Sequence, residues 1–316
     1  MDKITKAYLL IFLSMVLGST GPSTFLLIAK SIDCGVGVMY FLLFGGIVLL
    51  LMCYFIDTES WKNGEIKEAI NQKAVISILV AGVAVALMYL GYVKSMEMES
   101  ITEGVLIIRI SPLISIILAR LILKEKVRTW IGLIFAVAIC LGGIFIIRDM
   151  KNINLNNFFT PFIIMALSTA FFSSLSSVMA RNAQAVSTNK IGEDKKGLPN
   201  LFITGSEMLV GFFFLLLWNI VNQVNINLPD LRQFLFLFYL GVITVGIASY
   251  LYLKAYSLAN NYSRFVIMDY FFPIFTAINA YIINGERGLN YGRLFVGFVF
   301  ISFGTWIANK CILQKK

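Results

Sequence analysis

Three charged residues within long apolar segments are the first candidates for chemistry in this sequence. Arg109 lies in the segment 101–125, Asp269 in the segment 262–286, and Glu207 in the run TGSEMLVGFFFLL. A charge in the hydrocarbon core of a bilayer is costly, so such side chains usually face a cavity or a partner. We expect Arg109 and Asp269 to line a substrate cavity or a gate, unless they only compensate charge within the structure. Glu207 could bind a substrate cation, carry a proton or pair with an arginine.

Two of these three charged residues each lie about one turn before a proline. Arg109 precedes Pro112, and Asp269 precedes Pro273. Proline has no N–H, so the carbonyl groups of Ile108 and Asp269 lose their partners within the helix. Freed carbonyls beside a charge would form a polar spot at the middle of the membrane.

Tyrosines within the apolar segments of the chain combine an apolar ring with a hydroxyl group. Those near segment ends are explained by anchoring at the membrane interface. Tyr89, Tyr250 and Tyr270 lie deeper and are candidates for the wall of a binding pocket.

The residue types present argue against a cofactor or a metal site. The chain contains no histidine, and its four cysteines are far apart in the sequence. Such cysteines are expected to act as small hydrophobic residues rather than as a disulfide framework. No phosphate-binding P-loop is present, so direct coupling to ATP is not expected.

The composition places most of the chain in a bilayer. Of its 316 residues, 59% are hydrophobic and 14% are charged, with a mean hydropathy of +0.83. Soluble domains average roughly 45–50% apolar and about 25% charged residues. The net charge of +9 is scattered between apolar runs, which does not indicate a nucleic-acid partner.

Ten apolar segments approach the length of about 20 residues that a membrane helix needs. The first five are Ala7–Ala29, Gly37–Phe55, Ala74–Val93, Ile101–Leu123 and Thr129–Ile147. The second five are Phe158–Ala180, Leu201–Val221, Phe234–Leu253, Ser263–Ile283 and Gly292–Ala308. With the N-terminus inside, the inner segments hold 17 lysines and arginines and the outer segments hold 7. This bias predicts that both termini are cytoplasmic.

The two halves of the sequence repeat one design. A shift of 161 residues brings Pro112 onto Pro273 and Glu125 onto Glu286. The two glutamates follow segment ends, where a turn-capping role is the simpler expectation. Each half holds five segments, so the second half must enter the membrane from the opposite side. We predict an all-α polytopic membrane protein with ten transmembrane helices in two inverted five-helix repeats, residues 1–150 and 151–316.

The order of these features resembles a known family. The first copy reads LMYLGYVKSMEM, ISPLISIILARLILKEK and IGLIFAVAICLGGIFII, and the second reads YLYLKAYSLA, FFPIFTAINAYIINGER and GRLFVGFVFISFGTWI. This pattern is similar to the drug/metabolite transporter superfamily, specifically its EamA-type ten-span carriers. Members often end the fourth and ninth spans with Gly-Glu-Arg, which residues 285–287 keep and residues 124–126 replace with Lys-Glu-Lys. The resemblance implies a carrier of small metabolites.

These observations together predict a secondary carrier in the cytoplasmic membrane that works by alternating access. An amino acid or related zwitterion is the favoured substrate, with Arg109 facing its carboxylate and Glu207 or Asp269 facing its amine. Proton coupling, exchange and uniport stay open. The alternatives are an integral membrane enzyme, for which the sequence lacks a cluster of catalytic residues, and a membrane scaffold, which leaves the repeated prolines unexplained.

Overall fold

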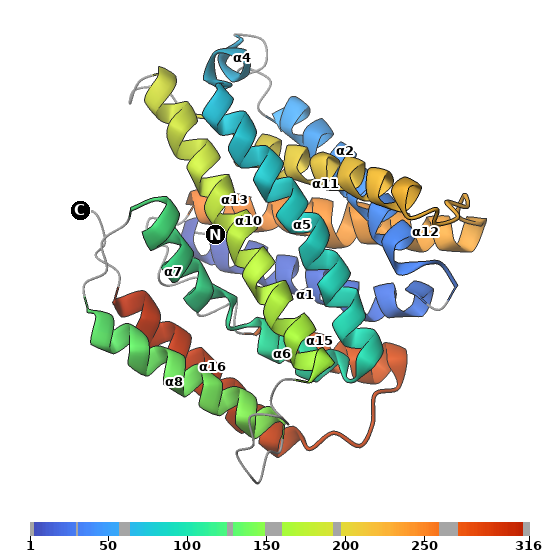
Figure 1. The fold of residues 1–316 in the computed structure, drawn as a ribbon, viewed down its shortest axis with the longest axis vertical. Coiled ribbons are helices and arrows are strands. Elements are labelled where there is room, and N and C mark those ends of the chain that lie inside the picture. Colours follow the sequence, from blue (N-terminus) through green and yellow to red (C-terminus); the bar gives the residue numbers. More distant parts are fainter. Residues whose placement is uncertain are drawn as a thin grey trace.

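Helices build the computed structural model, which describes residues 3–29, 31–56, 64–124, 129–148, 160–191, 197–258 and 271–311 (Figure 1). The first half of the chain forms α1 (Lys3–Ala29), α2 (Cys34–Ile56), α4 (Glu65–Ala69), α5 (Gln72–Met98), α6 (Ile101–Ile108), α7 (Ser111–Ile122) and α8 (Trp130–Ile147). The second half forms α10 (Pro161–Ile191), α11 (Asn200–Val221), α12 (Leu231–Tyr239), the π-helix η1 (Leu240–Ile247), α13 (Ala248–Leu258), α15 (Phe272–Asn284) and α16 (Tyr291–Lys310).

The predicted membrane spans coincide with these helices. Nine described helical stretches are long and apolar enough to cross a membrane, and α15 is a shorter apolar helix within the predicted ninth span. The fourth span consists of α6 and α7, and the eighth consists of α12, η1 and α13. The beginning of the ninth span, before Phe271, lies outside the described residues. The chain is an all-α polytopic membrane protein with two inverted five-helix repeats.

The predicted sixth span, Phe158–Ala180, ended too early. α10 continues past Ala180 and ends at Ile191. Polar contacts stabilise this extension: Ser187 Oγ accepts a hydrogen bond from the Leu198 backbone N–H at 2.9 Å. Lys190 Nζ also donates to the Ile70 carbonyl oxygen at 2.7 Å. Polar residues of the extension form hydrogen bonds with backbone atoms of neighbouring loops. Their low hydropathy is the reason why the predicted span stopped before the helix does.

Large apolar side chains cover the outside of the bundle. Ile131 on α8 is 85% exposed and Phe295 on α16 is 62% exposed. A surface of this kind is stable only where lipid replaces water. Lipid is therefore the solvent of these helix faces.

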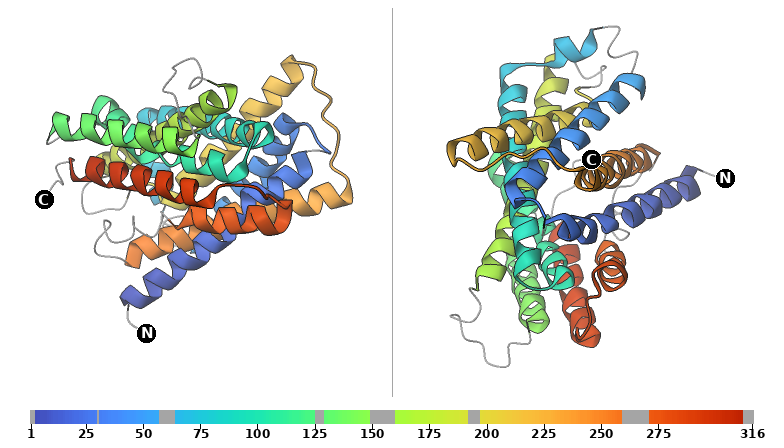
Figure 2. Two further views of the ribbon diagram at one scale, coloured as in Figure 1. Left: turned by 90° about the horizontal axis from the view of Figure 1, so that it is seen from below. Right: turned by 90° about the vertical axis from the view of Figure 1, so that its right-hand side faces the viewer.

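Helices pair across the boundary between the repeats. α5 runs along α10, α1 along α13, α2 along α11 and α8 along α16 (Figure 2). At the α8–α16 pair, a Cβ on Gly143 would lie 2.8 Å from the Gly297 carbonyl oxygen, and one on Gly304 would lie 2.9 Å from the Ala136 carbonyl oxygen. A shift of 161 residues converts one contact into the other. The contact is thus reciprocal, as expected at a pseudo-twofold axis between inverted repeats.

The fourth span is broken beside Pro112, as the sequence predicted. α6 ends at Ile108 and α7 begins at Ser111. Between them, the N–H groups of Arg109 and Ile110 donate to the carbonyl groups of Leu106 and Ile107, at 3.2 and 3.1 Å. These tighter bonds close the turn where the proline cannot continue the helix.

Candidate functional site

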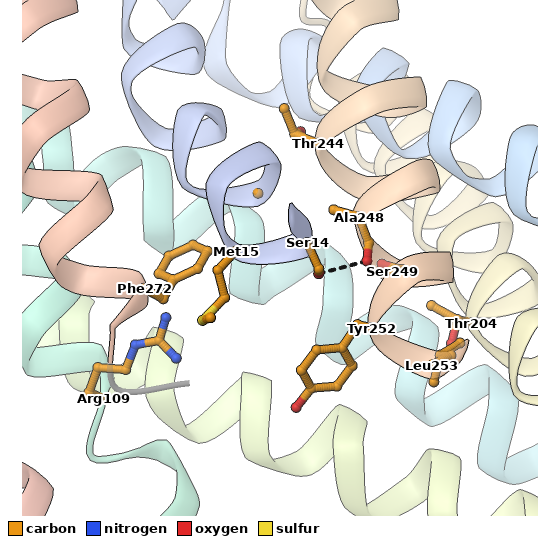
Figure 3. Close-up of a pocket in the computed structure, with 11 residues that line it drawn as sticks. Ser14, Met15, Arg109, Thr204, Thr244, Ala248, Ser249, Tyr252, Leu253 and Phe272 are labelled. Carbon is orange, nitrogen blue, oxygen red and sulfur yellow. Dashed lines mark hydrogen bonds between the residues drawn. The ribbon is translucent and has the colours of Figure 1, made fainter. Parts of the chain in front are cut away.

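A cavity of about 440 Å³ lies where both repeats meet the break in the fourth span (Figure 3). α1, the turn between α6 and α7, α11, η1, α13 and α15 all contribute to its wall. The hydroxyl-bearing residues of this wall are Ser14, Thr204, Thr244, Ser249 and Tyr252. Apolar side chains and a single arginine complete it among the described residues. The combination of a cation, hydroxyl groups and apolar surface suits a small polar or amphipathic ligand.

Arg109 brings positive charge to this cavity. It is the residue at the C-terminal end of α6, held in the tight turn that precedes Pro112. Its guanidinium carbon lies 4.4 Å from the centre of the Phe272 ring (Figure 3). Phe272 is the first residue of α15 and belongs to the other repeat. A guanidinium over an aromatic face is held by a cation–π interaction. The broken helix therefore presents a cation at the contact between the repeats.

The cavity lies toward one face of the membrane. Ser14 stands in the first half of α1 and Thr204 one turn into α11. Tyr252 stands in the second half of the eighth span, which α12, η1 and α13 form together. All three lie in the half of their span that is nearer the face where α1 begins. The cavity is thus displaced toward this face, called the α1-start face below.

The π-helix shapes one wall in a way that the sequence did not predict. Within η1, Thr244 Oγ1 donates to the Leu240 carbonyl oxygen at 2.6 Å. Just after η1, the Ala248 carbonyl oxygen accepts a hydrogen bond from Ser14 Oγ of α1 at 2.7 Å. π-helical turns often occur at functional sites. No proline or charge marks this turn, so periodicity alone gave no signal for it.

Glu207 lies behind the cavity wall rather than on it. The residue is 3% exposed, and it is not among the residues lining the cavity, although Thr204 one turn earlier is. Its Oε2 accepts a hydrogen bond from Ser176 Oγ of α10 at 3.5 Å. Its Oε1 has no hydrogen-bond partner among the described residues. A buried acid with an unsatisfied oxygen thus stands between α10 and α11.

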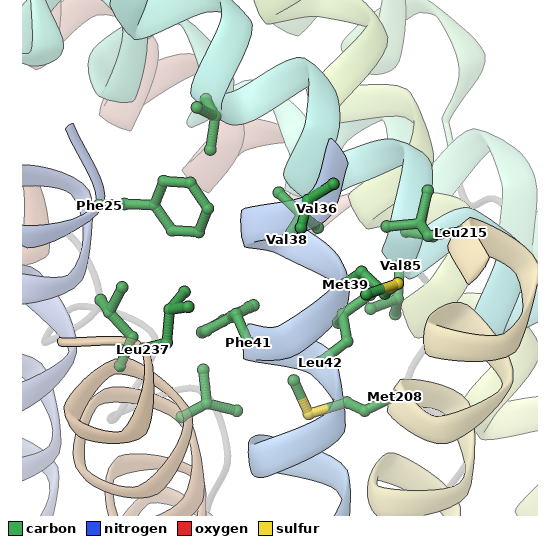
Figure 4. Close-up of a cluster of buried hydrophobic side chains, with 14 of the residues drawn as sticks. Phe25, Val36, Val38, Met39, Phe41, Leu42, Val85, Met208, Leu215 and Leu237 are labelled. Carbon is green, nitrogen blue, oxygen red and sulfur yellow. The ribbon is translucent and has the colours of Figure 1, made fainter. Parts of the chain in front are cut away.

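The candidate tyrosines Tyr89 and Tyr250 contact residues outside the cavity wall. Tyr89 packs edge-on against Phe41, with ring centres 4.6 Å apart. Phe41 belongs to the main hydrophobic cluster (Figure 4). The Tyr250 hydroxyl accepts a hydrogen bond from Lys254 Nζ at 2.8 Å. Neither residue lines the cavity, whereas Tyr252 does.

Two candidates from the second repeat, Asp269 and Tyr270, lie outside the described residues. Glu125, which marks the end of the first copy, lies outside them as well.

An ionic network occupies the opposite face of the membrane. It consists of Glu99, Glu103, Arg148 and Arg293. Arg148 Nη1 donates to Glu103 Oε2 at 2.9 Å, and Arg293 Nη2 donates to Glu103 Oε1 at 3.1 Å. Arg148 also forms a bidentate pair with Glu99. Burial alone would lower the pKa of Arg148, but hydrogen bonds and attraction from Glu99 and Glu103 raise it overall.

A polar contact beside this network involves one of the repeated glutamates. The Thr102 hydroxyl donates to Glu286 Oε2 at 2.6 Å. The two residues are far apart in the sequence and belong to different repeats. Sequence reasoning expected Glu286 only to cap a turn, because spacing along one segment does not show what lies across the repeat boundary.

Comparisons with known proteins agree with this architecture. The model of the EamA-like transporter family matches residues 5–149 and 160–309. A solved structure titled "Crystal structure of protein" is similar at a TM-score of 0.57 and 16% identity, covering 98% of this chain and 96% of that chain. At this identity the likeness concerns the fold alone. No curated protein matches the sequence. Since the family model covers both repeats, the chain belongs to the EamA-like transporter family.

Proposed function

We propose that this chain carries a small metabolite bearing a carboxylate, with an amino acid or related zwitterion favoured, across the cytoplasmic membrane by alternating access. The observation that carries the proposal is Arg109 in the wall of the cavity between the repeats. An arginine can hold a carboxylate through two parallel hydrogen bonds. Such a bond is stronger where the surroundings exclude water.

The remainder of the wall supports a modest-sized ligand. Five hydroxyl groups can exchange hydrogen bonds with polar parts of a substrate, while Phe272 and Met15 can contact its apolar part. The amine of a zwitterion would require an acid nearby. Glu207, one turn from Thr204, and Asp269 are the proposed partners, because each is an acid within an apolar segment.

Alternating access is supported by the difference between the two faces. The cavity lies toward the α1-start face, and the ionic network lies at the other face. Inverted repeats can exchange conformations, which moves the access route from one face to the other. The bias of lysines and arginines supports a cytoplasmic location for the α1-start face and for both termini.

Uptake into liposomes tests the substrate class. Purified protein would be supplied with radiolabelled amino acids, with unlabelled monocarboxylates or amines as competitors. We expect Arg109→Ala to reduce uptake about tenfold or more, since a hydrogen bond to a charged group contributes roughly 1.5–3 kcal/mol. Arg109→Lys should retain part of the activity. Competition by amines and not by carboxylates would contradict the assignment.

The matched control for this variant is Arg232→Ala. Arg232 is exposed and also lies over an aromatic ring, with 5.8 Å between its guanidinium carbon and the centre of the Phe236 ring. It does not line the cavity. Uptake should therefore be unchanged in Arg232→Ala. Equal uptake by the Arg109→Ala variant and the wild-type protein would refute the proposed site.

Proton coupling at Glu207 is the second part of the proposal. A carboxyl group buried between α10 and α11 with one unsatisfied oxygen can take up a proton without a counter-ion. We expect an imposed pH gradient to drive uptake by the wild-type protein, and Glu207→Gln to remove this response. If uptake by the wild-type protein does not respond to the pH gradient, proton coupling is excluded and exchange or uniport is favoured.

A further inference from the structure

We propose that the ionic network is the gate that closes the cavity at the face opposite the α1-start face, with Glu103 as the residue that holds it shut. The inference rests on the alternating access proposed above, and it assigns that closure to particular side chains. Opening would require Glu103 to release Arg293, so that the two repeats can separate at this face.

Glu103 joins the two repeats through one carboxylate. Its side chain is 8% exposed, and each of its oxygens accepts a hydrogen bond from a different arginine. Arg148 follows the end of α8 in the first repeat, and Arg293 lies in the first turn of α16 in the second. Charge-assisted hydrogen bonds are about twice as strong as neutral ones. A single side chain therefore crosses the boundary where the repeats would part.

The preceding residue forms a second link across the same boundary. Thr102 donates to Glu286, which follows the end of α15. Counted as whole residues, Thr102 is 3% exposed and Glu103 is 6% exposed, so both are buried at this boundary. Two consecutive residues at the start of α6 thus bind two different elements of the second repeat.

The short helix α6 connects this gate to the substrate cavity. Glu103 lies in its first turn and Arg109 at its end, about 9 Å apart along the axis at a rise of about 1.5 Å per residue. All but the last residue of α6 are buried. Pro112 provides a break immediately after Arg109, so α6 can tilt without α7. A ligand that repositions Arg109 would thereby act on the helix that carries Glu103.

Accessibility of the cavity tests the gate without knowledge of the substrate. The four native cysteines, all buried and free, would be replaced by alanine, and Ser249 of the cavity wall by cysteine. A membrane-impermeant maleimide would then be added at the face opposite the α1-start face. We expect Glu103→Gln to increase the labelling rate about tenfold, because losing a charge-assisted link favours the open state at this face.

Glu97→Gln is the matched control for this measurement. Glu97 pairs with Lys94 at 2.8 Å on the same helix, α5, so its loss breaks an ion pair without touching the repeat boundary. Labelling should stay at the rate of the parent protein. A Glu103→Gln variant that labels no faster than Glu97→Gln would overturn the proposal.

A crosslinked pair gives an independent answer if Glu103→Gln does not fold. Cysteines in place of Thr102 and Glu286 would be joined by a short bis-methanethiosulfonate reagent. We expect this link to abolish labelling of Ser249→Cys from the gate face, to preserve it from the α1-start face, and to be reversed by reductant. Unchanged labelling from the gate face would overturn the gate. If labelling responds to the link as expected but the protein transports no labelled amino acid, the gate stands and the proposed substrate is refuted.

Discussion

Two helix pairs that the pseudo-symmetry makes equivalent are packed differently. In one, α5 of the first repeat lies against α10; in the other, α13 of the second repeat lies against α1. At Gly91 of α5, a Cβ would lie 2.6 Å from Thr169 Oγ1 of α10. A shift of 161 residues leads from Gly91 to Tyr252, which lines the cavity. The α5–α10 pair, called the closed pair below, packs tightly at a glycine. The α1–α13 pair, called the open pair below, has a tyrosine at the equivalent position and borders the cavity there.

The same contrast extends to the helices themselves. α5 is an uninterrupted α-helix, whereas its counterpart is divided into α12, η1 and α13. The closed pair is further joined by a hydrogen bond from Asn182 Nδ2 to Ser77 Oγ at 2.8 Å. The repeated spacing of prolines sets a common architecture, and side-chain size at equivalent positions decides which pair closes. Inverted repeats with different packing are what a carrier needs to be open at one face only.

The largest effect on stability is expected from adding a methyl group at the contact within the closed pair. Gly91→Ala would place a methyl group against the Thr169 hydroxyl, which itself donates to the Met165 carbonyl oxygen at 2.8 Å. Overpacking costs about 1–3 kcal/mol, more than the roughly 0.5–1 kcal/mol that alanine gains over glycine within a helix. We expect a lower free energy of unfolding for Gly91→Ala, measured by denaturation in detergent.

Gly142→Ala is its control. A Cβ on Gly142 would meet only ordinary contact, with Phe300 Cδ1 at 3.8 Å. This variant should match or slightly exceed the stability of the wild-type protein. If Gly91→Ala were equally stable, the closed pair would not depend on the glycine.

Sequence reasoning found the architecture because prolines act locally and strongly. Pro112 and Pro273 lack a backbone donor wherever they stand, so their spacing showed the repeat before any contact was known. The break after Ile108 and the ten spans followed from the same pattern and from hydropathy. Arg109 could be singled out because a charge within an apolar segment is costly in lipid.

The rest of the candidate site depends on contacts that one segment does not contain. η1 changes the direction in which later side chains point. The sequence indicated Tyr250, and only the folded helix shows that Tyr252 lines the cavity instead. Glu103 and Arg293 meet across 190 positions of sequence. Nothing in the sequence around either residue indicates the other as its partner. Long-range pairing, rather than residue type, identifies the network.

An intermediate effect is expected on the tyrosine side of the comparison. Tyr252→Phe removes one hydroxyl group from the cavity wall. Because a hydrogen bond contributes roughly 0.5–1.5 kcal/mol, we expect KM for uptake to rise by a factor of about two to ten. Tyr250→Phe removes a hydroxyl group two residues away that contacts Lys254 and does not line the cavity. A larger rise in KM for Tyr250→Phe would place the substrate elsewhere.

The smallest effect is expected where α1 meets the end of η1. Ser14→Ala removes the hydrogen bond to the Ala248 carbonyl oxygen, which joins the open pair. Side-chain hydrogen bonds between membrane helices contribute about 0.6 kcal/mol on average, so unfolding should become easier by about this amount. Ser177→Ala, which breaks only the 2.9 Å bond to the Ser173 carbonyl oxygen within α10, should change stability less. If Ser14→Ala instead cost as much as Gly91→Ala, the open pair would be held as firmly as the closed one, and the contrast between the two pairs would lie in shape alone.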